Sequence, residues 1–109
     1  MPPIYPTLVR ASLISCEGSS CGTITGDLEF DDTDGPEYTS TSGDFSYARI
    51  WREPLGNNVY TWRMTLRYMG SGACQGLWTL QRTENDDDPV GEYQGWDGDT
   101  CTGSVIDIS

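Results

Sequence analysis

Histidine and lysine are absent from this chain of 109 residues. Without histidine there is no imidazole base for a serine or cysteine nucleophile, and without lysine the usual amine substitute is missing. Hydrolysis by a pair of carboxylates stays open to the chain, because acidic residues are plentiful. Those acids concentrate in segments typical of solvated loops, whereas a carboxyl group with a raised pKa needs burial beside apolar groups. We therefore expect no enzymatic activity, no catalytic residue and no bound cofactor.

Positive charge is scarce, since 6 arginines stand against 17 acidic residues and the formal net charge is −11. Such a chain repels phosphate backbones and anionic lipids, so we expect neither nucleic acid nor a membrane among its partners. Long apolar runs are also lacking, and none approaches the roughly 20 residues of a membrane-spanning helix. The first residues have neither the basic segment nor the long apolar segment of a secretion signal. We expect synthesis in the cytoplasm without export, or a signal that has been removed.

What the chain does contain is a succession of short segments with alternating hydrophobicity. The clearest covers residues 59–69, where Tyr60, Trp62 and Met64 begin an apolar series that alternates with polar residues. Alternation of this kind gathers apolar side chains on one face of a β-strand. Comparable segments occupy residues 7–15, 22–30, 44–52, 75–82, 92–96 and 103–108. The pattern predicts an all-β chain in which residues 1–109 form a single antiparallel β-sandwich or β-barrel-like domain of about seven strands.

Three local expectations accompany this fold. Residues 1–6 are predicted to form an N-terminal arm, and residues 31–43, which are polar and without a pattern, a long loop. In the last strand, Ile106 and Ile108 are predicted to face the interior.

The 4 cysteines allow three disulfide connectivities. Cys16 and Cys21 enclose a short loop between two predicted strands, at the neck of a hairpin where opposed Cα atoms come within bonding range. We therefore expect a Cys16–Cys21 disulfide and, by elimination, a Cys74–Cys101 disulfide. Four reduced thiols and a tetrathiolate zinc site are the alternatives, although the chain has no C-x-x-C spacing.

Clustered aspartates make calcium a second cation to consider. Asp86, Asp87 and Asp88 share one predicted loop, and Asp97 and Asp99 share the next. Calcium binds several oxygen atoms at close range, and clustered carboxylates can supply them. The alternative is that these acidic turns only solvate their loops.

Arg63 and Arg67 are predicted to project from the polar face of the strand at residues 59–69. They form a local positive stripe on an acidic body, and such complementarity suits self-assembly about a symmetry axis. The alternative is pairing within the chain, with Asp27 or Glu29 on a neighbouring strand.

The four tryptophans divide into two kinds. Trp62 and Trp78 lie on the apolar faces of their strands, which predicts packing in the core. Trp51 and Trp96 lie near predicted strand ends and are the better candidates for exposed aromatics. Exposed tryptophan is common at the centres of protein interfaces, and it can also stack on sugars.

Several stretches together carry a resemblance to a known class. They are the cysteine-bracketed hairpin, Tyr-x-Trp-x-Met-x-Leu at residues 60–66, Gly-Leu-Trp-Thr-Leu at residues 76–80 and the ending Cys-Thr-Gly-Ser-Val at residues 101–105. In these the chain resembles small accessory proteins of tailed-bacteriophage virions. The resemblance implies a β-sandwich or β-tulip that adds to a preformed capsid or tail as a cement, decoration or head-completion component.

The resemblance therefore predicts a non-enzymatic structural protein that binds a preformed virion surface through strand edges, loops and the N-terminal arm. It implies the major capsid protein or another virion protein as partner, a homo-oligomer with a trimer favoured, and a location in the virion after assembly in the host cytoplasm. The alternative function is a carbohydrate-binding or adhesin module that uses exposed tryptophan.

Overall fold

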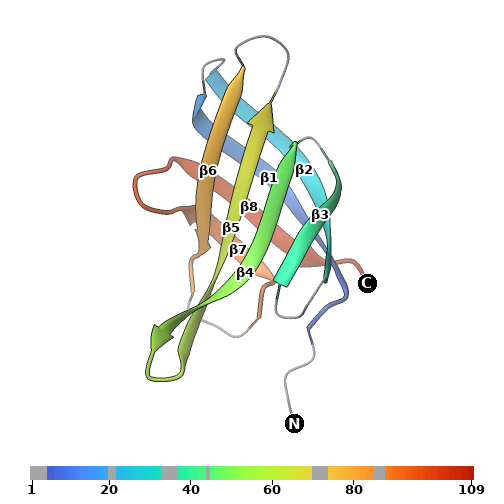
Figure 1. The fold of residues 1–109 in the computed structure, drawn as a ribbon, viewed down its shortest axis with the longest axis vertical. Helices are drawn as coiled ribbons and strands as arrows, with labels where there is room; N and C mark the ends of the chain where they lie inside the picture. The colour runs from blue at the N-terminus through green and yellow to red at the C-terminus, as the bar shows by residue number, and fades with distance from the viewer. Residues whose placement is uncertain (1–4, 20–21, 33–36, 44, 70–73, 85–87) are drawn as a thin grey trace.

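Eight antiparallel strands follow one another around a closed barrel in the computed structural model of the chain (Figure 1). Each strand pairs with the next in sequence, and the last pairs with the first. The structure describes residues 5–19, 22–32, 37–43, 45–69, 74–84 and 88–109. The strands are β1 (Leu8–Ser19), β2 (Gly22–Asp32), β3 (Glu37–Gly43), β4 (Tyr47–Gly56), β5 (Val59–Met69), β6 (Gln75–Arg82), β7 (Gly91–Gly95) and β8 (Cys101–Asp107). The expected all-β, barrel-like class is confirmed.

Side chains fill the interior of the barrel. Trp62 on β5 is fully buried, with its ring centroid 5.5 Å from that of Tyr5 and 6.0 Å from that of Tyr38. An eight-stranded barrel is just wide enough to be filled in this way. Trp78 on β6 is also buried, so the predicted core role of Trp62 and Trp78 is confirmed.

The prediction of a long loop at residues 31–43 is wrong. β2 continues to Asp32, and β3 covers Glu37–Gly43 between β2 and β4. β3 has little apolar alternation of its own. It forms a strand because its backbone pairs with strands on both sides and one large side chain anchors it. That side chain is Tyr38, which is fully buried and donates a hydrogen bond to the carbonyl of Pro6 at 2.7 Å.

The predicted N-terminal arm lies partly outside the described residues. Its last two residues, Tyr5 and Pro6, pack against the barrel end instead of extending away from it. Tyr5 contacts the ring of Trp62 and accepts a hydrogen bond from Arg52 at 2.7 Å. The described end of this segment therefore belongs to the core.

The predicted inward orientation of Ile106 is also wrong. Val105 is buried, whereas Ile106 is 42% exposed and Ile108 lies beyond the end of β8. β8 begins at Cys101, whose side chain faces the interior, and the two-residue period then directs Gly103 and Val105 inward. Gly103 fits because Ile14 occupies the space where its side chain would lie.

The predicted pairings Cys16–Cys21 and Cys74–Cys101 are both wrong, because Cys16 and Cys101 form a disulfide with each other. The β1–β8 register places these two residues opposite each other, with Cα atoms 4.2 Å apart. On the β2 side Cys16 faces Ile24, since β1 continues beyond its predicted end to Ser19, which pairs with Gly22. Cys74 is also disulfide-bonded, and no described cysteine is a free thiol, so the reduced and zinc-bound alternatives fail for the described part of the chain.

Candidate functional site

The outer side of β4, β5 and β6 carries the predicted interface residues. In the register, Trp51 lies opposite Arg63, and Arg63 lies opposite Gln81. Further along β5, Arg67 lies between Tyr47 of β4 and Leu77 of β6. These strands form the near wall of the barrel in Figure 1, so two rows of side chains cross one continuous face.

The first row, which we call the arginine–tryptophan row, consists of Arg49, Trp51, Glu53, Arg63 and Trp96. The Arg49 guanidinium lies 5.0 Å from the ring centroid of Trp51, whose indole nitrogen donates a hydrogen bond to Glu53 at 2.8 Å. The Arg63 guanidinium lies 4.1 Å from the ring centroid of Trp96 and 3.7 Å from Glu53. Cation–π contacts and ion pairs thus hold the half-buried Trp51 and the exposed Trp96 in place.

Neighbouring residues fix the two arginines of this row. Arg49 pairs with Glu37 of β3 at 2.6 Å, and Arg63 donates a hydrogen bond to Gln81 of β6 at 3.0 Å. The Arg63 side chain is only 15% exposed, so its contacts are screened less by solvent than those of an ordinary surface ion pair.

Trp96 comes from the turn that follows β7, which folds back onto β6. Its backbone amide donates to the carbonyl of Thr79 at 2.9 Å, and the Thr79 amide donates to the carboxylate of Asp99 at 2.8 Å. Asp97 and Gly98 have left-handed backbones with φ of 57° and 92°, as a tight turn requires. This turn therefore carries Trp96 to Arg63 from a distant part of the sequence.

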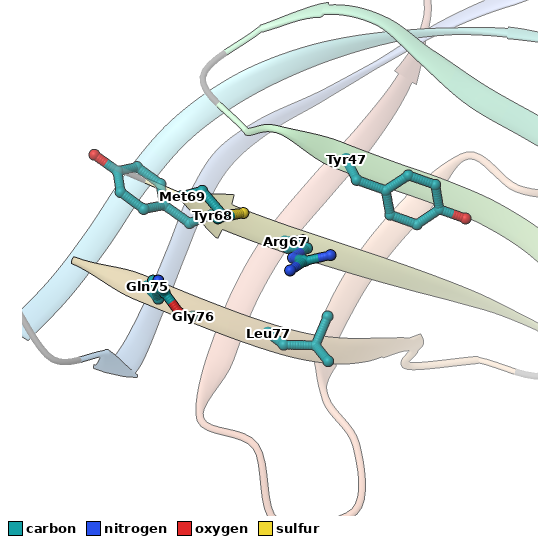
Figure 2. Close-up of a pocket in the computed structure, with 7 residues that line it drawn as sticks. All are labelled: Tyr47, Arg67, Tyr68, Met69, Gln75, Gly76 and Leu77. Carbon is teal, nitrogen blue, oxygen red and sulfur yellow. The ribbon is translucent and has the colours of Figure 1, made fainter. Parts of the chain in front are cut away.

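The second feature, which we call the Arg67 hollow, is an open depression at the far end of the same face. Its outer rim is formed by Tyr47, Met69 and Leu77, which are 48%, 52% and 66% exposed. Figure 2 shows Arg67 between Tyr47 and Leu77, with each of the three side chains on a different strand. No carboxylate among the described residues forms an ion pair with Arg67. A cation rimmed by apolar side chains is therefore presented to solvent.

The structure brings three of the predicted interface residues together. Trp51, Arg63 and Trp96 belong to one row, and Arg67 lies four residues further along the same face of β5. The alternative pairing with β2 is wrong for Arg63, because Glu29 pairs with Arg10 of β1 and β2 is not adjacent to β5.

Sequence reasoning missed the partners of these residues. Arg49, Glu53, Tyr47, Met69 and Leu77 complete the two features. Glu53 lies just beyond the predicted strand at residues 44–52, and the only sequence signal for the other four was their alternate position along predicted strands. Their contacts depend on the strand register.

Among the predicted calcium ligands that the structure describes, Asp88 is not brought together with Asp97 and Asp99. Asp88 precedes β7 and accepts a hydrogen bond from the amide of Val90, whereas Asp97 and Asp99 follow β7 at its other end. Asp86 and Asp87 lie outside the described residues. Within the part of the chain that the structure describes, no three acidic, histidine or cysteine side chains are grouped in a way that could hold a metal ion.

A further polar cluster, which the sequence did not indicate, closes one end of the barrel interior. Arg82 of β6 is almost fully buried and lies against Gly91. The buried hydroxyl of Tyr93 donates to the carbonyl of Pro89 at 2.7 Å, and burial raises the pKa of Tyr93 although the charge of Arg82 opposes the shift. Burial, reinforced by the charge of Asp32, also raises the pKa of Tyr38.

Comparison with known proteins found no matching family model, no matching curated protein and no matching solved structure. No helix among the described residues is long and apolar enough to cross a membrane.

Proposed function

We propose that this protein is a non-enzymatic structural protein of a tailed-bacteriophage virion, which binds the surface of a preformed capsid or tail through the arginine–tryptophan row. The observation that carries the proposal is the fixed placement of Trp51 and Trp96 by Arg49 and Arg63 on a rigid sheet. Tryptophan and arginine are the residues most enriched among those that dominate binding energy at protein interfaces.

Preorganisation supports this role. The row is held by contacts among four strands and one turn, so little side-chain freedom remains to be lost on binding. A net charge of −11 keeps free copies soluble, while the face itself gathers three of the six arginines. The virion partner comes from the sequence resemblance, and the row supplies the surface that would meet it.

The carbohydrate-binding alternative predicts a free aromatic platform. In the row, an arginine guanidinium covers one face of each ring, which leaves less ring surface for stacking on a sugar. A protein partner can contact the whole arginine–tryptophan row, including the hydrogen-bonding groups of its arginine and glutamate side chains.

The test uses particles produced from a genome that lacks this gene, to which the purified chain is added back. We expect the wild-type chain to bind in large, symmetry-related copy number, and the Trp96→Ala and Arg63→Gln variants to bind at least about tenfold more weakly. Arg10→Gln is the matched control, because Arg10 also pairs with a glutamate but lies on β1 at the opposite wall. Binding of only a few copies, or equal losses in Arg10→Gln and Arg63→Gln, would contradict the proposal. Glycan-array binding that is lost in Trp96→Ala would favour the carbohydrate alternative.

A further inference from the structure

We propose that the Arg67 hollow receives Leu13 from a second copy of this chain, with Asp27 of that copy placed beside Arg67. The inference rests on the proposed function, because it names the neighbour at one end of the same outer face. It adds a contact between copies to the contact with the particle.

Leu13 is the most anomalous residue on the surface. It has a left-handed backbone with φ of 56°, a conformation that glycine or asparagine adopts far more readily than leucine. Its side chain is 80% exposed, so the unfavourable backbone is not offset by packing within the molecule. Strained residues that persist in this way cluster at functional sites.

A β-bulge explains the position of Leu13 but not its identity. The pairing of β1 shifts around Leu13 on both sides, between Ala11 and Ile14 towards β2 and between Ser12 and Ser15 towards β8. The extra residue allows Ala11 and Ile14 both to face the core, and it pushes Leu13 out of the wall. Glycine would serve this geometry better, so the exposed apolar side chain needs another reason.

The bulge and the hollow are complementary in chemistry. The Leu13 amide donates a hydrogen bond to the carboxylate of Asp27 at 3.2 Å, which keeps an acid beside the apolar projection. The hollow presents the opposite arrangement, a cation without a carboxylate partner among the described residues, rimmed by exposed apolar side chains. Apolar contact and opposite charge therefore coincide when one copy meets the next.

The topology determines what kind of contact this is. β1 and β5 are four strands apart in the eight-stranded ring, so the bulge and the hollow lie on opposite walls of the barrel. Different surfaces meet, and the contact is head-to-tail, which produces a ring or an open chain of copies. Because each copy carries a charge of −11, the contact needs salt to screen the long-range repulsion or a high local concentration on a particle.

The first test measures self-association of the full chain by sedimentation velocity in about 0.15 M salt, where the Debye length is about 8 Å. We expect concentration-dependent association that Leu13→Ala weakens at least about tenfold. Leu55→Ala is the matched control, because Leu55 is also an exposed leucine but lies in the β4–β5 hairpin. Circular dichroism checks that each variant keeps the barrel.

The second test exchanges the charges. Asp27→Arg and Arg67→Asp are each expected to abolish association, and the double variant, in which the pair is reversed, is expected to restore it. A mixture of Leu13→Ala with Arg67→Asp should form 1:1 dimers that grow no further, because only one intact bulge and one intact hollow remain. A benzoylphenylalanine crosslinker in place of Leu77 should label the peptide that contains residue 13.

Two outcomes would overturn the inference. One is a wild-type chain that stays monomeric up to millimolar concentration. The other is association at a different surface, seen as equal association of Leu13→Ala and Leu55→Ala or as crosslinks to peptides that lack residue 13. Particle binding separates this inference from the proposed function. If the wild-type chain is monomeric in solution and both it and the Leu13→Ala chain bind particles, the proposed function stands. Only the contact between copies is then removed.

Discussion

At the scale of single residues, two glycines permit close approaches, Gly95 beside the binding face and Gly103 in the core. A Cβ atom at Gly95 would lie within van der Waals overlap of the Asp99 backbone carbonyl, 1.8 Å away, and 2.9 Å from the Cys101 amide. Gly95 thus permits the tight return that brings Trp96 to Arg63. A Cβ atom at Gly103 would meet only the end of the Ile14 side chain, at 2.6 Å.

These two glycines give a matched prediction. Gly95→Ala should lower the free energy of unfolding by about 3 kcal/mol, because the backbone of the turn must move, and Gly103→Ala by about 1 kcal/mol, because a flexible side-chain end can shift. Denaturant unfolding followed by tryptophan fluorescence measures both values. Equal costs at the two positions would show that the turn does not depend on this close approach.

At the scale of elements, the face is assembled by strands with different sequence signals. β5 and β6 coincide with the predicted ranges because apolar and polar residues alternate along most of β5 and because Trp78 and Leu80 align on one face of β6. β3 was missed because it is rich in serine and threonine, and backbone pairing with β2 and β4 stabilises it. The inward phase of β8 was misassigned because Val105 and Ile106 are both apolar, so the local pattern fits either face. Alternation predicts a strand, whereas its neighbours determine which face is buried.

The contact between β5 and the turn after β7 can be measured by a double-mutant cycle. Arg63→Met and Trp96→Phe, alone and combined, should show a coupling free energy of about 0.5–1 kcal/mol, because the Arg63 guanidinium lies over the Trp96 ring. The matched cycle pairs Arg63→Met with Tyr47→Phe, whose side chain belongs to the Arg67 hollow, and should show no coupling free energy. A coupling of zero in the first cycle would contradict a preformed row.

At the scale of the whole molecule, closure of the barrel joins the two ends of the sequence. The Cys16–Cys101 disulfide spans 85 residues and lies between β1 and β8. A cross-link over so long a loop stabilises the fold mainly by reducing the entropy of the unfolded chain, by typically 2–4 kcal/mol. Tyr38 and Tyr93 fill the interior with aromatic bulk, and each hydroxyl is satisfied by a backbone carbonyl.

These buried tyrosines predict a fall in stability at alkaline pH. Their pKa values are raised above about 10, the value in an unfolded chain, because burial disfavours the phenolate. The unfolded chain therefore loses phenol protons above pH 10 while the folded chain keeps them. The free energy of unfolding should therefore be constant with respect to these groups below pH 10. Above pH 10 it should decline by up to about 1.4 kcal/mol per pH unit for each tyrosine.

Urea unfolding between pH 8 and pH 11.5 tests this dependence. Tyr93→Phe should reduce the alkaline slope, although it lowers stability at neutral pH by about 1 kcal/mol through loss of the hydrogen bond to Pro89. Tyr47→Phe is the control, because the Tyr47 side chain lies on the outer face and is about half exposed. An unchanged slope in Tyr93→Phe would mean that another group controls alkaline unfolding.

The sequence by itself determined the all-β class, the position of the strands with the clearest alternation, the burial of Trp62 and Trp78 and the acidic composition, because these follow from local periodicity and composition. The tertiary structure decided the closure of β8 on β1, the Cys16–Cys101 pairing and the membership of the two rows on the outer face. Register and barrel closure place residues far apart in the sequence side by side, and a local pattern carries no information about that placement.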